Sequence, residues 1–344
     1  MKKLLLLVAA VLIVGVGYLA LKGTPVNELT VLSWDYYIGP TTIADFEEEH
    51  HAKVTYEMIK SNEEAMARIK ANPGVYDVIV LTDYAVDTLR NEGGLMKLDL
   101  GALSNAKNIA ESFKGGYFDP GMEYSVPYAY GTTGFAVNRA EIPDVPITWK
   151  ELTKPEYKGK VAIMDDMRYV LGSVLMELGY SPNTVNPKEI DAAVALLQAV
   201  MPNVVKFTSA SPVDLMVSGG ALVGYSWSGD ALQMQEENAE IAYEIHAYGT
   251  LKFFDNMVIL ADAPHREAAH AYIDFILRPD VSAAITDEIQ YGNPNVAAID
   301  LIADDVRSNP AVFPAPEAMA KLQFITEVGD DLALYEKAWE KMKQ

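Results

Sequence analysis

The sequence predicts an α/β protein of about two domains, each built on a mainly parallel sheet flanked by helices. Short apolar segments alternate with amphipathic ones, and this alternation restarts after about residue 133. The chain has 344 residues, enough for about two domains of roughly 150 residues each. Strands and helices alternate in this way when crossover helices join parallel strands.

The first part of the chain contains three predicted strands, each followed by a helix. The strands are expected at 28–34, 52–58 and 76–81, and the helices at 41–50, 61–72 and 84–94. The second helix opens with a capping box, because Ser61 is followed three residues later by Glu64. The third helix is stopped by the glycines that end its segment.

The pattern restarts in the second part of the chain. Strands are expected at 161–165, 221–227 and 256–264, and helices at 186–200 and 265–280. At the start of the first of these helices, Asn186 is the predicted cap, Pro187 takes the first helical position and Glu189 the third. The sequence shows no repeat and no low-complexity linker between these elements.

Residues 1–22 form a separate segment with the composition of an export signal. The segment begins with lysines and then carries no charge from Leu4 to Leu21. Its apolar region is long for a secretory signal, its best cleavage candidate is Gly15-Val16-Gly17, and its length is near the minimum for a membrane span. We expect a signal peptide or an uncleaved membrane anchor, with the body of the protein periplasmic or otherwise extracytoplasmic.

Charge and composition exclude several functions. Asp and Glu number 48 against 27 Lys and Arg, which gives a net charge of -21. A surface this acidic repels nucleic acid and anionic membranes and attracts cations. The chain has no cysteine, which rules out disulfides, thiolate metal sites and cysteine nucleophiles.

Acidic and aromatic residues gather at the ends of the predicted strands. The first strand ends in the cluster "WDYY", residues 34–37, which is costly to expose and awkward to bury. The full set of candidates is Trp34, Asp35, Tyr36, Tyr37, Asp83, Tyr84, Asp165, Asp166, Trp227, Asp230, Phe253, Phe254, Asp255 and Tyr291. Taken singly, each acid with its neighbouring aromatic residue is also consistent with a helix cap beside a core aromatic residue.

Together these positions indicate a binding site for a cation. In open α/β sheets, ligands bind beyond the carboxyl ends of the strands. Aromatic faces attract cations by about 0.5–2 kcal/mol each, and carboxylates accept charge-assisted hydrogen bonds from ammonium groups. An aromatic box with acids at its ends suits a slender ligand that has an apolar body and cationic termini.

The sequence gives little support for an enzyme. The segment "GYSWSG" misses the nucleophile-elbow spacing, and no phosphate-binding loop or dinucleotide fingerprint is present. The histidines show no metal-ligand spacing on one helix face. One alternative stays open, a hydrolase that holds a metal with Asp165 and Asp166. We otherwise expect no catalytic residue, no cofactor and no metal.

Several ordered motifs carry a resemblance that runs from about residue 29 to the C-terminus. They include "YSVPYAYGTTGFAVN", "KPEYKGKVAIMDD", "ELGYSPNTVNPKEI", "ILRPDV" and "GNPN". In these motifs the chain resembles the extracytoplasmic polyamine-binding proteins of ABC importers, the spermidine/putrescine receptors. The resemblance implies the two-lobed periplasmic-binding-protein fold of type II. The first lobe is expected at 27–132 and 254–298, and the second at 133–253 and 299–344.

The resemblance also implies a function. A receptor of this kind closes its lobes on a polyamine, performs no covalent chemistry and delivers the ligand to the permease subunits of an ABC transporter. The matching positions are Trp34, Tyr37, Tyr84, Trp227, Phe253 and Tyr291 for the aromatic box, Asp255 for the main ammonium-binding carboxylate, and Asp166 and Asp230 for further acids. Asp35, Tyr36 and Asp83 lie beside these positions and complete the predicted set. We expect a monomer that binds no nucleic acid.

Departures from the family leave the identity of the polyamine open. Relatives place a ligand-binding glutamate where this chain has Tyr169. Spermidine receptors carry a glutamine near Ile325 and a tryptophan at Phe253. Putrescine and spermidine are both candidates, and putrescine is expected to bind at least as well. The alternatives are another cationic solute on the same scaffold, such as an amino acid, a cationic vitamin or a metal ion, and the metal-dependent hydrolase.

Overall fold

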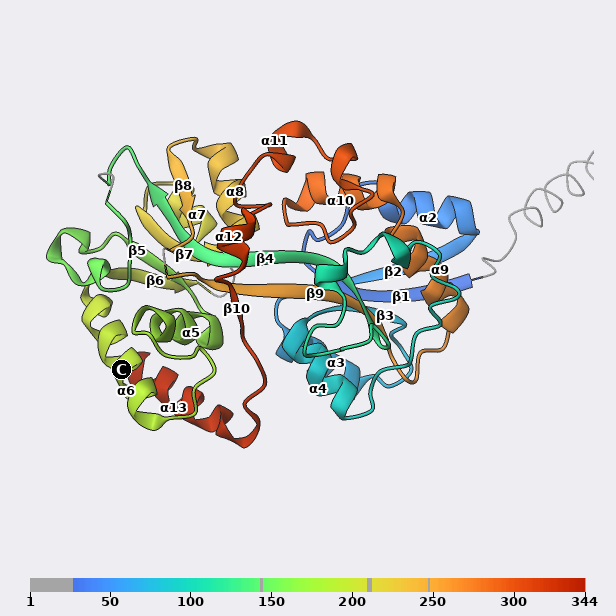
Figure 1. Ribbon diagram of the computed structural model, residues 1–344, viewed down its shortest axis with the longest axis horizontal. Helices are drawn as coiled ribbons and strands as arrows, with labels where there is room; N and C mark the ends of the chain where they lie inside the picture. Colours follow the sequence, from blue (N-terminus) through green and yellow to red (C-terminus); the bar gives the residue numbers. More distant parts are fainter. Residues whose placement is uncertain (1–26, 143–144, 209–211, 247, 344) are drawn as a thin grey trace, which may run out of the picture.

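The computed structural model describes residues 27–142, 145–208, 212–246 and 248–343 (Figure 1). The predicted signal peptide or membrane anchor at residues 1–22 therefore lies outside the described residues. Within the described ranges, no helix combines the length and apolar character needed to cross a bilayer.

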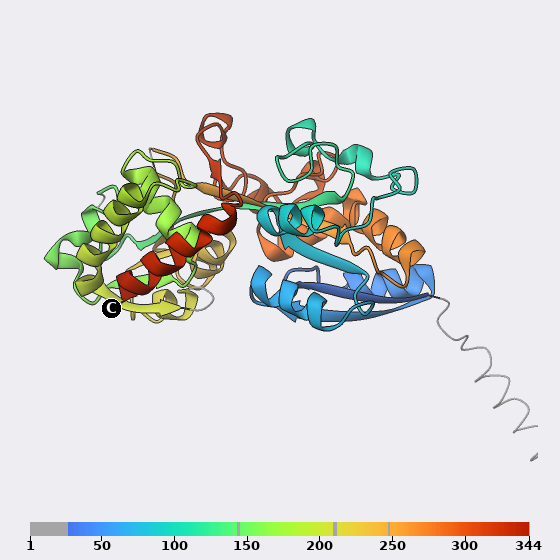
Figure 2. The same ribbon diagram turned by 90° about the horizontal axis from the view of Figure 1, so that it is seen from below.

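Two lobes joined by long strands make up the molecule (Figures 1 and 2). The strands are β1 (Asn27–Trp34), β2 (Ala52–Ile59), β3 (Val78–Thr82), β4 (Ser125–Asn138), β5 (Val161–Met164), β6 (Val204–Thr208), β7 (Val223–Trp227), β8 (Ile241–Glu244), β9 (Leu251–Ile259) and β10 (Gln323–Phe324). The helices are α2 (Thr42–His50), α3 (Asn62–Ala71), α4 (Asp83–Asn91), α5 (Met167–Glu177), α6 (Pro187–Val200), α7 (Val213–Val217), α8 (Ser228–Glu237), α9 (Arg266–Ile276), α10 (Pro279–Ile289), α11 (Asp304–Arg307), α12 (Pro316–Met319) and α13 (Leu332–Lys343). Paired strands follow the order β2-β1-β3-β9-β4-β7-β5-β6 from one lobe to the other.

In the first lobe, β1 lies between β2 and β3 and is parallel to both. Its core is continuous and apolar, because Val31, Leu32, Val78 and Ile79 are fully buried between the layers. Strands that are covered on both faces have this composition. Helices α2 and α9 lie on one side of these strands, and α3 and α4 lie on the other (Figure 1).

The second lobe repeats this arrangement. β5 lies between β6 and β7 and is parallel to both. Helices α5, α6 and α13 pack together on one side, and α7 and α8 lie on the other (Figure 1). The expected α/β class with mainly parallel sheets is therefore confirmed in both lobes.

Two long strands run from one lobe into the other. β4 pairs with β9 from Ser125 to Thr132 and then with β7 from Thr133 to Val137. β9 is antiparallel to both β3 and β4. The short strand β10 pairs with the start of β9 beside this crossing.

Several local predictions are confirmed. The Glu64 N–H donates to Ser61 Oγ at 3.0 Å, and the Lys188 N–H donates to Asn186 Oδ1 at 3.1 Å, so both predicted caps form. The predicted helix at 265–280 is wrong as one element. Arg278 takes an extended conformation before Pro279, which starts the separate helix α10.

The strand at the end of the second part is shifted relative to its prediction. β9 covers Leu251–Ile259, whereas the sequence indicated 256–264. No strand was predicted over β4 and no helix over α5. Pro127 and two glycines interrupt the apolar pattern of β4, and such residues weaken a strand prediction.

Candidate functional site

The predicted site residues come from both lobes and meet where the lobes join. β1 and β3 of the first lobe and β5 and β7 of the second end at this junction, and β9 passes through it. The carboxyl ends of the parallel strands therefore face one another, as expected for a ligand site in an α/β protein.

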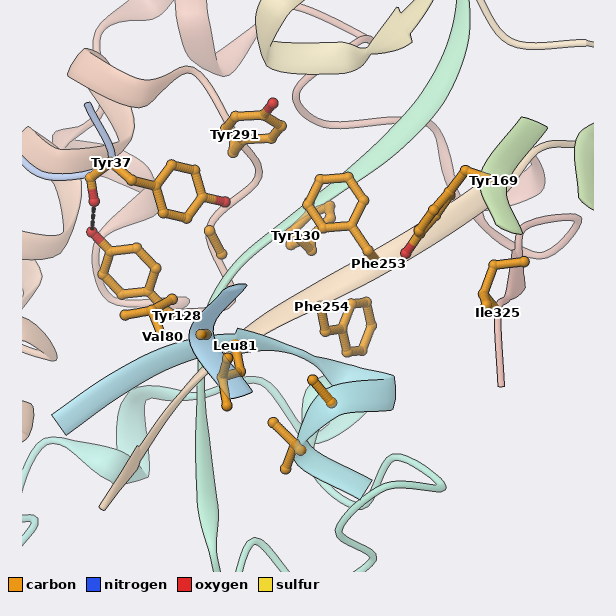
Figure 3. Close-up of a cluster of buried hydrophobic side chains, with 14 of the residues drawn as sticks. Tyr37, Val80, Leu81, Tyr128, Tyr130, Tyr169, Phe253, Phe254, Tyr291 and Ile325 are labelled. Atoms are coloured by element: carbon orange, nitrogen blue, oxygen red, sulfur yellow. Dashed lines mark hydrogen bonds between the residues drawn. The ribbon is translucent and has the colours of Figure 1, made fainter. Parts of the chain in front are cut away.

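Asp255, on β9, is a buried carboxylate held by two hydroxyl groups. The Tyr37 hydroxyl donates to its Oδ2 at 2.8 Å, and Thr82 Oγ1 donates to its Oδ1 at 2.9 Å. Only 4% of the residue is exposed, and burial raises the pKa of Asp255 to about 6 although both hydroxyl bonds favour the charged form. Tyr37 is fixed in turn by the Tyr128 hydroxyl, which donates to the Tyr37 carbonyl at 2.6 Å (Figure 3).

Five rings form what we call the aromatic row, which begins beside Asp255. Successive ring centroids are 5.4 Å apart for Tyr37 and Tyr291, 5.8 Å for Tyr291 and Phe253, 5.1 Å for Phe253 and Trp227, and 4.6 Å for Trp227 and Tyr169. Every contact is edge-to-face, a favourable aromatic geometry. Tyr37 and Tyr291 lie at one end and Tyr169 at the other, with Phe253 between them (Figure 3).

Glycines allow the row to pack against the neighbouring backbone. A Cβ atom at Gly229, in the first turn of α8, would lie 2.4 Å from the Tyr291 ring. A Cβ atom at Gly131, on β4, would lie 2.5 Å from Phe253. Any larger side chain at either position would displace a ring of the row.

Asp83 is buried beside the row, but both of its carboxylate oxygens already contact other groups of the protein. The Phe254 N–H donates to Oδ2 at 2.9 Å, and Oδ1 lies 2.9 Å from the Tyr117 hydroxyl. Burial raises the pKa of Asp83 to about 7. The contacts tie the first residue of α4 to β9, so they position the strand that carries Asp255.

Acids from both lobes approach one another at the Tyr169 end of the row. Asp166 caps α5 and accepts the Tyr169 N–H at 3.0 Å. Burial raises the pKa of Asp166 to about 6, and the negative charge of Glu63 in the first lobe adds to this shift. Tyr84 belongs to the same group, because its hydroxyl donates to Glu63 Oε1 at 3.1 Å. This local excess of negative charge would attract a cation.

The remaining predicted residues differ in exposure. Trp34, Trp227 and Asp230 are half-buried, and Asp230 lies beside Tyr291 in the first turn of α8. The indole Nε1 of Trp34 is buried without a hydrogen-bond partner among the residues that the structure describes. Asp35 and Tyr36 lie at the surface, and Tyr36 is 83% exposed with a left-handed φ of 51°.

The four residues of the "WDYY" cluster differ in burial. Tyr37 is 6% exposed, and Phe253 and Tyr291 are similarly buried. The rings bury one another, because residues of the two lobes and of β9 pack in a single row.

Asp165 and Asp166, the carboxylate pair that suggested a metal site, have separate contacts. Asp165 is exposed and pairs with Lys343, whereas Asp166 caps α5. Among the described residues, no group of three or more His, Asp or Glu side chains is arranged to hold a metal ion.

Sequence reasoning did not assign several residues of this region to the site. Thr82, Tyr128 and Glu63 bond to predicted residues, and Tyr169 closes the row as part of its aromatic set. Thr82 ends β3, so the strand-end rule could have found it. Tyr128 and Glu63 lie within a strand and a helix, where no such signal applies.

Comparison with known proteins gives matches along most of the chain. A family profile described as bacterial extracellular solute-binding protein matches residues 41–315. The spermidine/putrescine-binding periplasmic protein of Salmonella typhimurium is 35% identical over 319 residues, which cover 92% of each chain. A putrescine-binding periplasmic protein of Pseudomonas aeruginosa is 32% identical and covers 92% of this chain and 91% of its own.

A solved structure gives the same result. The spermidine/putrescine ABC transporter substrate-binding protein of Streptococcus pneumoniae superposes with a TM-score of 0.83 at 30% identity. The match covers 92% of this chain and 98% of the pneumococcal chain.

Proposed function

This chain belongs to the bacterial extracellular solute-binding proteins, and we propose that it captures a polyamine between its lobes and delivers it to an ABC importer. The family consists of binding proteins and not enzymes, so the metal-dependent hydrolase alternative is wrong. One observation carries the proposal: a buried carboxylate, Asp255, begins a row of aromatic rings to which both lobes contribute.

Asp255 would hold one ammonium group of the ligand. An ammonium donates charge-assisted hydrogen bonds to a carboxylate, while Tyr37 and Thr82 keep the carboxylate oriented. The raised pKa of Asp255 reflects a burial cost that such a cation would offset.

The rest of the predicted set would hold the chain and the second amine. The methylene chain would lie along Phe253 and Tyr291, with the half-buried rings of Trp34, Tyr84 and Trp227 around it. Asp166, from the second lobe, would face the far amine, and Asp230, beside Tyr291, would offer an acid at a shorter reach. In this proposal Asp83 acts through β9, and Asp35 and Tyr36 lie at the entrance.

Binding would close the lobes. We propose the boundaries expected from the sequence, 27–132 with 254–298 for the first lobe and 133–253 with 299–344 for the second. Ligand contacts made by both lobes would stabilise the closed state over the open one, with β4 and β9 as the flexing connections.

Putrescine and spermidine are both candidate ligands of the proposed site. The names of the relatives include both putrescine and spermidine. At the Tyr169 end of the row, Ile325 is 1% exposed and packs toward Gly172, so it adds an apolar side chain beside the acids there. A third amine would have to share the acids that face the second one. We therefore propose that putrescine binds at least as well as spermidine.

The partner would be the permease of an ABC importer, and the protein acts outside the cytoplasm as its family does. We further propose that residues 4–21 tether a monomeric receptor to the inner membrane. N-terminal sequencing of exported protein tests the tether, and a start near residue 18 to 24 would show cleavage instead.

Asp255→Asn is the direct test of the proposed function. The change keeps the shape and removes the charge, and loss of one partner from a buried charged pair costs roughly 3–5 kcal/mol. In calorimetric titrations, the affinity for both putrescine and spermidine should therefore fall by at least about a hundredfold.

Asp45→Asn, an exposed acid on α2, is the matched control and should bind like the wild type. A wild-type protein that binds neither polyamine would refute the function. Binding of another cationic solute in its place would favour the same scaffold with a different ligand. Unchanged affinity in Asp255→Asn would refute the assigned site.

A further inference from the structure

Tyr169 has a buried hydroxyl group that forms no hydrogen bond with the part of the protein that the structure describes. The residue lies in the first turn of α5 and is 2% exposed. Its ring is fixed edge-to-face against Trp227 at 4.6 Å and against Phe253 at 6.4 Å. Its hydroxyl oxygen has no hydrogen-bond partner among the residues that the structure describes.

A buried hydroxyl without a partner is unfavourable, because it has lost water and gained nothing in exchange. Phenylalanine would fill the same space without this cost. The two buried tyrosines beside Asp255 do not share the feature. The Tyr37 hydroxyl donates to Asp255, and the Tyr128 hydroxyl donates to the Tyr37 carbonyl.

The hydroxyl points into the row. Figure 3 shows it directed toward Phe253. Phe253 and Asp255 are two residues apart on β9, so they share one face of the strand and lie about 7 Å apart along it. A short molecule could therefore reach from Asp255 of β9, past the Phe253 ring, to Tyr169 of the second lobe.

The electrostatic surroundings favour a cation at this point. After burial itself, the negative charges of Asp83 and Asp166 are the main causes that raise the pKa of Tyr169 well above its usual value. The phenol therefore keeps its proton, and its oxygen offers lone pairs to a donor. An ammonium group is a donor that also compensates the nearby carboxylate of Asp166.

We propose that the Tyr169 hydroxyl accepts a hydrogen bond from the second ammonium group of the ligand and makes the receptor selective for short diamines over monoamines. The inference rests on the proposed function and assigns a specificity-determining residue within the same site. It also gives a role to position 169, where the sequence departs from the glutamate of its relatives.

Tyr169→Phe tests the assignment, because it removes one oxygen and keeps the ring. Two ligands are compared by calorimetry: putrescine, and 1-aminobutane in competition with putrescine. The monoamine has the same carbon chain without the second ammonium. The affinity for putrescine should fall roughly 10- to 100-fold, as for a lost hydrogen bond to a charged group. The affinity for 1-aminobutane should not change.

Stability provides a readout that a structural role would not give. The ligand-free melting temperature of Tyr169→Phe should be unchanged or higher, because the lost hydroxyl has no protein partner. Tyr157→Phe is the matched control, since that buried tyrosine bonds to Glu151 Oε1 at 3.2 Å in the second lobe. It should lower the melting temperature and leave putrescine affinity unchanged.

The experimental outcomes distinguish a wrong assignment of Tyr169 from a wrong proposed function. If the wild type binds putrescine and Tyr169→Phe binds it equally well, the assignment of Tyr169 is wrong. A clear drop in ligand-free melting temperature would make the hydroxyl a structural group and also refute it. If the wild type binds no amine, the proposed function falls and the assignment falls with it.

Discussion

At the scale of single residues, hydrogen-bond counting indicates the protonation state of Asp83. The Tyr117 hydroxyl lies 2.9 Å from Asp83 Oδ1 and 2.9 Å from the Ile325 carbonyl. One hydroxyl proton cannot serve both acceptors. If Asp83 carries a proton, it donates to Tyr117, and Tyr117 donates to Ile325. Every group then has a partner, in agreement with a pKa that burial raises to about 7.

Asp83→Asn should therefore stabilise the ligand-free protein at high pH. A raised carboxyl pKa in the folded state gives stability that is complete below the unfolded pKa, about 3.9, and is lost as pH rises through about 7. An amide does not titrate and can still donate to Tyr117. The unfolding free energy of the variant minus that of the wild type should rise by on the order of 2–3 kcal/mol from pH 5 to pH 8.

Denaturant titrations without ligand at pH 5 and pH 8 measure this difference. Asp45→Asn, the exposed control on α2, should show no such gain. An equal effect of Asp83→Asn at both pH values would mean that Asp83 is charged throughout the range.

At the scale of elements, the sequence predicted the strands and helix caps that local sequence patterns determine. The strands at 28–34 and 221–227 and the caps at Ser61 and Asn186 follow from periodicity and capping chemistry, and all are confirmed. The direction of β9 was not predictable, because an antiparallel strand between β3 and β4 has no local signature. Strand ends also indicated where a site would form.

The contacts within the site depend on tertiary structure. Tyr37 and Asp255 are 218 positions apart in the chain, and Asp83 is 171 positions from Phe254. The pairing of β1 with β3 and of β3 with β9 brings them together. Sequence reasoning could therefore propose Asp83 as a site acid, but it could not find the Tyr117 and Phe254 contacts that occupy its oxygens.

The start of α8 gives a prediction at this scale. Gly229→Ala would place a Cβ atom 2.4 Å from the Tyr291 ring, so that the ring must move out of the aromatic row. We expect putrescine affinity to fall by roughly tenfold or more, as for an overpacking cost of about 1–3 kcal/mol. Gly94→Ala meets contacts at an ordinary 3.4 Å and serves as the control. Wild-type affinity in Gly229→Ala would show that Tyr291 does not need its observed position.

At the scale of the whole molecule, the lobes touch on more than one side of the crossing strands. Gln290, after α10, donates to Glu236 of α8. The segment after β10 contacts both lobes, because Arg168 Nη2 donates to the Thr326 carbonyl at 3.2 Å and Thr88 Oγ1 donates to Glu327 at 3.2 Å. These polar contacts and the ring contacts of the aromatic row would break if the lobes open, so contacts made by a ligand can bias the molecule toward the closed state.

Ligand-driven closure can be measured by energy transfer between dyes on the two lobes. The chain has no cysteine, so Asp45→Cys on α2 and Lys206→Cys on β6 provide two labelling sites at exposed positions. These elements lie at opposite ends of the molecule (Figure 1). Saturating putrescine should narrow the transfer-efficiency distribution and shift it upward, because a ligand that both lobes contact favours the closed state.

The Asp255→Asn background separates closure from other effects of the amine. At the same putrescine concentration this variant should keep the ligand-free distribution, since its ammonium partner is gone. Sodium chloride at matched ionic strength should also leave the wild-type distribution unchanged, which excludes simple screening of the acidic surface. Calorimetric binding without any change in transfer efficiency would contradict closure. It would mean that the lobes already hold in solution the packed arrangement of the aromatic row.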